Sequence, residues 1–291
     1  MRTLLSVLIL YLSIKSDVDA YRRIVGGRDA TLDEFPYVAA WGHFYLYNNK
    51  RTFSLTCTCS FLLPNWAITA SHCIDTNATT LGFVLYGNIV PGQQSNYTKV
   101  LQVYRHPNYF DSSEDTGTSK NDIGLLRTNN TQLLTYAILS AVDYTTMIGH
   151  EVFLPGYGGT NDTERVADVI SLNKTLQVFK GMINTCTAED SLISNGVCVS
   201  SPCEHVAMIC GGDSGGPLIH ASGIVGVFAS RGVMCDTNRQ FGNIHRFSLA
   251  KVSSAIAQPV SPVANWLYMK YIRSKICIFI RNENCIKDKD L

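Results

Sequence analysis

The sequence has little charge and almost no excess of either sign. Only 16% of its 291 residues are charged, and 24 lysines and arginines stand against 23 acids, for a formal net charge of +1. No basic run is interleaved with aromatic residues, and Gly211–Gly212 lacks the Gly-Lys-Ser/Thr ending of a phosphate-binding loop. We therefore expect no nucleic-acid or nucleotide partner, and the charge does not point to an anionic membrane surface.

The usual zinc motifs are also missing. The sequence contains no His-Glu-x-x-His and no paired Cys-x-x-Cys. We therefore expect no metal and no other cofactor. The histidines other than His72 are interpreted as ordinary surface or core residues: His43, His106, His150, His205, His220 and His245.

The sequence lacks an apolar run long enough to span a bilayer, which needs about 20 residues. The apolar stretch Leu4–Ile14 follows Arg2 and precedes small residues that end at Ala20. This layout is typical of a secretory signal peptide, and an uncleaved anchor is the alternative. We expect residues 1–20 to be removed, and the mature protein to be secreted without a membrane attachment.

Cysteines and glycosylation motifs agree with export. Ten cysteines are an even number, which fits disulfides formed in an oxidising compartment. Several Asn-x-Thr sequons predict exposed, glycan-bearing loops. These sequons begin at Asn77, Asn96, Asn129, Asn161 and Asn173.

Most of the remaining chain has the pattern of short β-strands. Segments rich in Val, Ile, Phe, Tyr and Thr lie between Gly, Pro and Asn clusters, and many strands at this spacing favour a barrel or sandwich. The segments are 37–47, 53–63, 65–70, 82–87, 98–106, 122–127, 151–158, 175–179, 196–199, 217–221, 223–230 and 243–248. Only Pro262–Ile276 shows helical periodicity. The sequence therefore predicts an all-β fold with one terminal helix.

One serine lies in a glycine-dense stretch that suggests a nucleophile. Ser214 stands in "GGDSGGPL", where glycines allow close approach of another group. Upstream are His72 in "TASHC" and Asp122 in "NDIGLL". Alone, His72 could be structural and Asp122 a turn residue. The order His, Asp, Ser differs from the order Ser, acid, His of α/β-hydrolases, so a lipase-like hydrolase is disfavoured.

Residues 24 to about 272 resemble a secreted serine protease of the chymotrypsin/trypsin family. The resemblance rests on five motifs in order: "RIVGG", "TASHC", "NDIGLL", "GGDSGGPL", and "GIVGVFASRGVMC" followed by "FGNI". It implies two packed antiparallel β-barrels with the active site between them, then a C-terminal helix. The expected parts are a signal peptide (1–20), an activation propeptide (21–23), an N-terminal barrel (24–135), a C-terminal barrel (136–261), and a helix with a cysteine-bearing tail (262–291).

The resemblance also implies roles in hydrolysis of peptide bonds through an acyl-enzyme. Ser214 would be the nucleophile, His72 the general base and Asp122 the residue that orients the imidazole. The backbone N–H groups of Gly212 and Ser214 would bind the oxyanion. The expected partners are protein or peptide substrates and protein protease inhibitors, and we expect a monomer. The alternative is a catalytically silent homologue that acts as a binding or decoy protein.

The same resemblance implies a zymogen. An activating protease would cut after Arg23, and the new ammonium group of Ile24 would pair with the buried carboxylate of Asp213, an interaction that is costly to break. A dibasic turn at Arg22–Arg23 without processing is the alternative.

Three disulfides follow from the resemblance: Cys57–Cys73, Cys186–Cys198 and Cys210–Cys235. A further family bridge is absent, because Val152 and His220 stand at its two positions. The remaining cysteines fall outside the pattern, and their pairing cannot be read from sequence. Cys277–Cys285 is one possibility, which leaves Cys59 and Cys203.

The resemblance places Met208 at the floor of the primary specificity pocket and Gly242 at its back wall. An apolar floor without a carboxylate predicts cleavage after apolar residues and not after Arg or Lys. The usual Ser-Trp-Gly segment is here Ala229-Ser230-Arg231, so a hydroxyl that supports the catalytic aspartate is lost. An inward-facing Arg231 would instead favour acidic residues.

Calcium is not expected in the loop where some relatives bind it. No acidic residue lies between Asp75 and Asp111, and calcium needs several carboxylate or carbonyl oxygens.

Overall fold

A computed structural model describes residues 27–90, 95–111, 119–159, 175–185, 196–200, 209–229 and 244–249, with only the backbone at 111, 119–120 and 244–249. These residues are almost entirely β-strand, and their helical turns are the short 3₁₀ turns Ser71–Cys73 and Tyr144–Met147. The predicted all-β class is thereby confirmed. The predicted helix at 262–276, the signal peptide and the propeptide lie outside the described residues.

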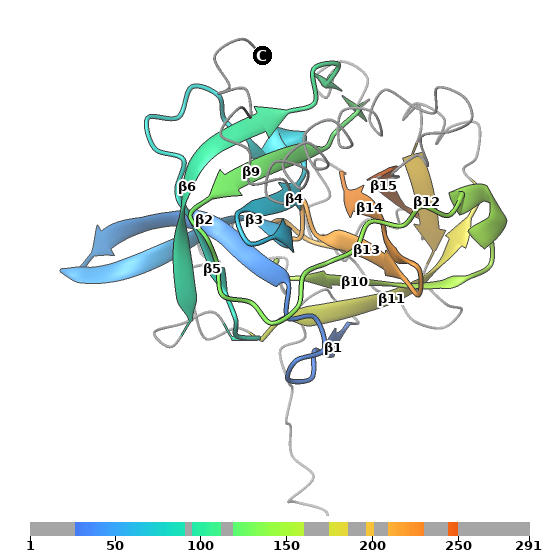
Figure 1. The fold of residues 1–291 in the computed structure, drawn as a ribbon, viewed down its shortest axis with the longest axis horizontal. Coiled ribbons are helices and arrows are strands. Elements are labelled where there is room, and N and C mark those ends of the chain that lie inside the picture. Colours follow the sequence, from blue (N-terminus) through green and yellow to red (C-terminus); the bar gives the residue numbers. More distant parts are fainter. Residues whose placement is uncertain are drawn as a thin grey trace, which may run out of the picture.

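The first half of the chain forms a closed barrel (Figure 1). The strands run in the order β2-β3-β4-β9-β6-β5. Their bounds are β2 Val38–Tyr47, β3 Lys50–Leu63, β4 Trp66–Thr69, β5 Phe83–Tyr86, β6 Asn96–Arg105 and β9 Gly124–Thr128. Alternate side chains point inward along a strand, so residues such as Phe61, Val84 and Leu126 fill the barrel interior.

Strands β2 and β3 form a long hairpin that projects from this barrel (Figure 1). Asn48 and Asn49 make its two-residue turn with φ of 49° and 59°. Asparagine tolerates these positive φ values, and such turns match the twist of paired strands. Near the tip, the guanidinium of Arg51 lies 3.9 Å from the ring centroid of Phe44 and 5.3 Å from that of Tyr97 in β6, and these contacts hold the hairpin against its neighbour.

The second half forms a sheet that closes on itself. Its order is β1-β11-β10-β13-β14-β15-β12, and a further pairing of β11 with β12 completes the second barrel. The bounds are β1 Arg28–Asp29, β10 Glu151–Gly156, β11 Gln177–Asn184, β12 Gly196–Ser200, β13 Pro217–His220, β14 Gly223–Phe228 and β15 Ile244–Leu249. Although β1 precedes the first barrel in the chain, it pairs with β11 of the second.

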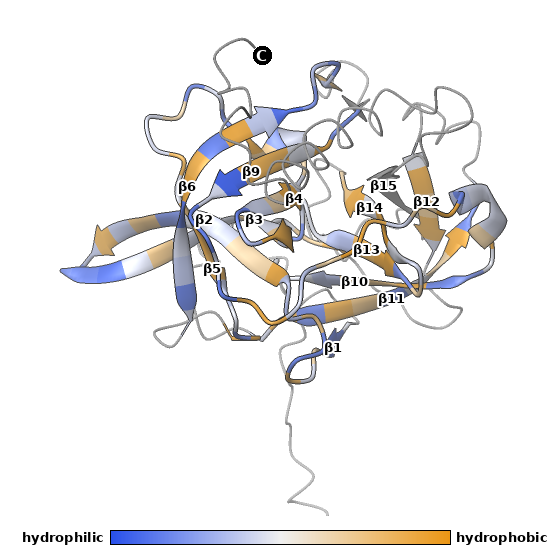
Figure 2. Cartoon of the chain, in the orientation of Figure 1, coloured by the Kyte–Doolittle hydropathy of each residue, from blue (hydrophilic) through white to orange (hydrophobic). Residues whose placement is uncertain are grey.

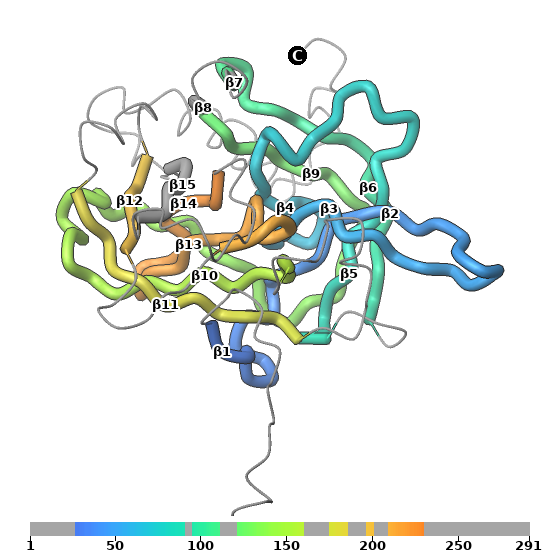
Figure 3. The backbone as a smooth tube through the Cα atoms, turned by 180° about the vertical axis from the view of Figure 1, so that it is seen from behind, coloured from blue at the N-terminus to red at the C-terminus, as the bar shows by residue number. Residues whose placement is uncertain are grey.

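The barrels lie side by side, as the view from behind shows (Figure 3), and apolar residues follow the strands of both (Figure 2). One buried cluster joins Ile68 and Leu125 of the first barrel to Ile224 and Val227 of the second. This shared core places the end of β4 close to the loop before β13.

Every predicted strand segment overlaps a strand of the structure. The strands that the pattern did not predict are β1, β7 (Phe110–Asp111) and β8 (Ser119–Lys120), each of two residues, which is too short for an alternating pattern. The predicted boundary between residues 135 and 136 lies in the connection between β9 and β10. No helix of the described residues is long and apolar enough to cross a membrane.

Candidate active site

His72 and Asp122 meet where two distant segments of the first barrel come together. His72 lies in the 3₁₀ turn after β4, and Asp122 lies just before β9. The imidazole Nδ1 is 2.6 Å from Asp122 Oδ2, and the backbone N–H of His72 donates to Oδ1 at 2.8 Å. The Asp122 side chain is fully buried and that of His72 is 10% exposed. The carboxylate therefore fixes both the position and the tautomer of the ring, which leaves Nε2 to act as a base.

Ser214 approaches the same place from the second barrel. Its carbonyl oxygen accepts a hydrogen bond of 2.9 Å from the backbone N–H of Thr58 in β3. Thr58 follows Cys57, whose disulfide to Cys73 joins β3 to the turn that carries His72. The predicted Cys57–Cys73 bridge is thus confirmed, and it joins the strand that bonds to Ser214 to the turn that carries His72.

A close backbone approach at Gly215 brings the loop of Ser214 against β4. A Cβ atom at this position would overlap the hydroxyl of Thr69 and the carbonyl oxygen of Thr58. Its φ of 79° is also one that residues with side chains rarely adopt. Only glycine permits this contact, and it sets Ser214 beside the segment that leads into the His72 turn.

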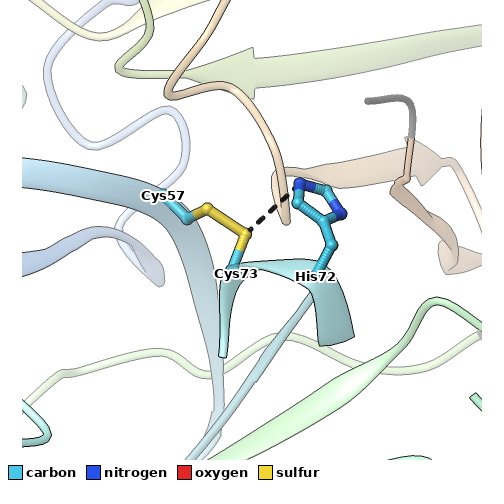
Figure 4. A group of neighbouring side chains, drawn as sticks. All are labelled: Cys57, His72 and Cys73. Carbon is cyan, nitrogen blue, oxygen red and sulfur yellow. Dashed lines mark hydrogen bonds between the residues drawn. A yellow bond between two sulfur atoms is a disulfide. The ribbon is translucent and has the colours of Figure 1, made fainter. Parts of the chain in front are cut away.

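The imidazole Nε2 faces the sulfur of Cys73 (Figure 4). It lies 3.7 Å from Sγ of Cys73, and no hydrogen bond joins it to Ser214 Oγ, both residues being among those described. In free enzymes the bond between nucleophile and base is often long and tightens when substrate binds. The sulfurs of Cys57 and Cys73 lie near this ring like a set of metal ligands, but their disulfide leaves no thiolate to bind an ion.

Two backbone N–H groups beside Ser214 are available to a ligand. In the described part of the chain, the N–H groups of Gly212 and Ser214 have no acceptor, whereas that of Asp213 between them donates to Cys210 O at 3.1 Å. Gly212 has φ of 97°, and a Cβ atom there would lie 2.9 Å from Leu55 Cδ2. Its conformation is therefore restricted to glycine.

Asp213 has its carboxylate inside the second barrel. The residue is fully buried. Oδ1 accepts from the N–H of Gly158 at 2.7 Å, and Oδ2 accepts from the N–H of Cys210 at 2.9 Å. These two backbone donors fix the orientation of the carboxylate at the start of the Ser214 loop.

Comparison with known proteins identifies the family of the chain. The family model named Trypsin matches residues 24–256. The chain belongs to the trypsin family of serine proteases. It is therefore a serine endopeptidase, and its substrates are proteins.

Individual relatives of this protease are moderately similar to it. Serine protease SP24D of Anopheles gambiae is 30% identical over 211 residues, which cover 70% of each chain. Alkaline trypsin A of Manduca sexta is 26% identical over 277 residues, which cover 92% of this chain and 98% of the relative. Isozyme C of the Lumbricus rubellus fibrinolytic enzyme is 26% identical over 67% of this chain and 81% of its own.

Three further cysteines of the protease lie among the described residues: Cys59, Cys198 and Cys210. Cys198 and Cys210 are each disulfide-bonded to residues outside the described part, so their predicted pairing with Cys186 and Cys235 stays a prediction. Cys59 is a buried free thiol, and burial raises its pKa far above the usual range. It is therefore not a reactive nucleophile.

Several predicted positions can be placed and others cannot. Ala229 is buried at the end of β14, and the sequon residues Asn77, Asn96 and Asn129 are exposed. The predicted residues outside the described part are Arg23, Ile24, Asn161, Asn173, Met208, Arg231 and Gly242.

Sequence reasoning missed Thr58. This fully buried residue donates its hydroxyl to Gly212 O at 2.8 Å and accepts from the N–H of Tyr157 at 3.1 Å. It thereby connects β3 of the first barrel to the loop of Ser214. The available signal was a threonine set between two cysteines, Cys57 and Cys59.

Proposed function

We propose that Ser214, His72 and Asp122 form the catalytic triad of this protease. The observation that carries the proposal is the pair of hydrogen bonds from His72 to the buried carboxylate of Asp122, beside the loop of Ser214. This arrangement suits a base whose ring cation is stabilised as it forms.

The reaction follows from these positions. Ser214 Oγ attacks the peptide carbonyl carbon while His72 Nε2 takes its proton, and the carbonyl electrons move to oxygen. The N–H groups of Gly212 and Ser214 stabilise this oxyanion, each being worth about 3–4 kcal/mol of barrier. Collapse breaks the C–N bond, and the leaving amine takes the proton from Nε2. Water then repeats the sequence on the acyl-enzyme and releases the acid.

Loss of the nucleophile tests the triad. The activated Ser214→Ala protein should lose about 10⁶-fold in turnover, as in a comparable triad. A serine-directed phosphonate should label the wild type and leave the variant unlabelled, which mass spectrometry would show. A wild type that is neither labelled nor active would instead support the silent, binding homologue. Equal activity of the two proteins would remove Ser214 from the mechanism.

The zymogen hypothesis belongs to this proposal. The signal peptide at 1–20 would direct secretion, and an activating protease would cut after Arg23 to free Ile24. The segment that follows Ile24 is anchored: Asp29 accepts a hydrogen bond from Gln177, and Ala30 N–H donates to Leu176 O at 2.8 Å. These contacts hold the N-terminal segment on the second barrel, which also contains Asp213.

The specificity hypothesis rests on the sequence alone. Met208 at the pocket floor lacks the carboxylate that a basic substrate residue would need, so we propose cleavage after medium or large apolar residues. Some relatives are named trypsin, which makes cleavage after Arg or Lys the competing expectation. A peptide-library profile of the activated enzyme would show after which residues it cleaves and so distinguish these two expectations. A basic profile would refute the argument from Met208, and an acidic one would place Arg231 in the pocket.

A further inference from the structure

Outside the triad, two histidines of the second barrel meet at its surface. His150 immediately precedes β10, and His220 ends β13, which pairs with β10 through Phe153 and Ile219. His150 Nδ1 lies 3.2 Å from His220 Nε2, and the ring centroids are 5.3 Å apart. His150 is exposed and His220 half-buried, so solvent reaches the pair.

The separation of these nitrogens matches that of two ligands on one metal ion. Zn²⁺ binds imidazole nitrogen at about 2.0–2.1 Å, so two ligands of a tetrahedral ion lie about 3.3–3.4 Å apart. The two rings therefore need only a small adjustment to hold one ion between them. The remaining coordination positions face solvent and can be filled by water.

Two serines support the ring of His220 from behind. Its Nδ1 lies 2.8 Å from Ser222 Oγ, and Ser222 Oγ lies 2.7 Å from the hydroxyl of Ser140, which is 1% exposed. Metal-binding histidines commonly donate their second ring nitrogen to such a partner, which fixes the ring and its tautomer. The side chain of His220 is thus oriented by a partly buried pair of hydroxyl groups.

The two imidazole rings can bind a metal ion while both remain neutral. The backbone N–H of Ser222 donates to His220 Nδ1 at 3.2 Å, so in the neutral ring the proton is on Nε2 and points to His150 Nδ1. A metal ion at Nε2 displaces this proton, and Nδ1 takes up one proton that it donates to Ser222 Oγ, so the hydrogen bond from the Ser222 N–H is lost. His150 binds through the lone pair that already accepts. Neither ring changes its charge.

We propose that His150 and His220 form a two-imidazole site for a divalent transition-metal ion. Bound metal would join the turn before β10 to the turn between β13 and β14. Imidazole suits Zn²⁺ and Cu²⁺, with Cu²⁺ tighter, whereas Ca²⁺ and Mg²⁺ prefer oxygen. This site departs from the expectation of no metal, because motif spacing cannot detect ligands 70 residues apart.

The test uses the mature Ser214→Ala protein, which does not digest itself. Equilibrium dialysis against Zn²⁺ or Cu²⁺ measures bound metal, and thermal unfolding measures the linked stabilisation. One ion per chain is expected, with a rise in the unfolding midpoint for these two ions and none for Ca²⁺ or Mg²⁺.

Variants assign the ion to this pair. His150→Gln and His220→Gln should each weaken binding at least about tenfold, and Ser222→Ala about tenfold, within the range for outer partners. His43→Gln, at a half-buried histidine of the first barrel, is the control and should bind as the parent does. Midpoints without metal show that each variant folds. Absence of binding to the parent, or unchanged binding by both histidine variants, would overturn the proposal.

Discussion

At the scale of single residues, Thr58 connects the first barrel to the loop of Ser214. It forms four hydrogen bonds, with Thr69, Tyr157, Gly212 and Ser214. Two of them use the side-chain hydroxyl. Because this hydroxyl fixes the carbonyl of Gly212, it also helps to position the backbone N–H of the same residue, which is the proposed oxyanion donor. Thr58 is a positioning residue because it acts through the groups that would contact substrate.

Replacing this hydroxyl tests the role. Thr58→Val keeps the shape of the side chain but leaves Gly212 O and Tyr157 N–H buried without a partner, at a cost of about 1–3 kcal/mol each. We expect a lower free energy of unfolding and, because the oxyanion donors shift, a fall in kcat of about tenfold or more with little change in KM.

The controls separate positioning from packing. Thr58→Ser retains the hydroxyl and should recover kcat. Thr52→Val lies on the same strand, where its hydroxyl contacts only Lys50 O at 3.3 Å, and should leave both constants unchanged. An unchanged kcat in Thr58→Val would show that the hydroxyl only stabilises the fold.

At the scale of elements, β1 and the turn after it depend on one ion pair. Arg28 Nη1 donates to Glu34 Oε2 at 2.8 Å, and the N–H of Thr31 donates to the same carboxylate oxygen at 2.9 Å. The hydrogen bond from Arg28, helped by that from Thr31, lowers the pKa of Glu34 to about 2. The carboxylate therefore closes the turn as long as it stays ionised.

This lowered pKa predicts an acid-sensitive element. In the unfolded chain the Glu34 pKa returns to 4.5, so its stabilisation is complete above that pH and is lost as pH falls toward 2. Arg28 is 48% exposed, so solvent screening limits the effect to about 0.5–1 kcal/mol. Glu34→Gln should be less stable than wild type near pH 6, and the difference should shrink as pH falls through 4.

Chemical unfolding from pH 6 to pH 3 measures this difference. Asp33→Asn is the control, because Asp33 is exposed and its φ of 63° suits asparagine as well. A Glu34→Gln difference that is constant with pH would contradict the assignment.

At the scale of the whole molecule, the proposed activation couples the chain start to the site between the barrels. A new ammonium group at Ile24 would enter the second barrel and pair with Asp213, which shares its loop with Gly212 and Ser214. On this proposal, the N-terminal segment would have to be cut before the loop reached its active conformation.

The position of the cut gives a matched pair of variants. Arg23→Gln removes the residue before the scissile bond, so treatment with an arginine-specific protease should leave the protein inactive. Arg22→Gln keeps that bond and should be activated normally, with Ile24 as the N-terminus by mass spectrometry. Full activity from a chain that retains Tyr21–Arg23 would refute the zymogen hypothesis.

The sequence by itself determined the class of the fold and the family. Strand positions are visible because each strand buries alternate side chains between turn residues, a pattern carried by consecutive positions. The residues His72, Asp122 and Ser214 could be named because motifs around them resemble a known family, although nothing local shows that they meet. Strands of two residues, such as β1, bury too little to leave a pattern.

Only the tertiary structure decided which distant residues meet. The barrel closures, the four contacts of Thr58 and the free thiol of Cys59 depend on strand register and on packing between the barrels. The pairing of His150 with His220 arises in the same way, because β10 and β13 are neighbours in the sheet although the two histidines are 70 residues apart in the sequence. The conformational preferences that a sequence pattern reveals act over a few residues. These contacts depend instead on how the two barrels close and pack against each other.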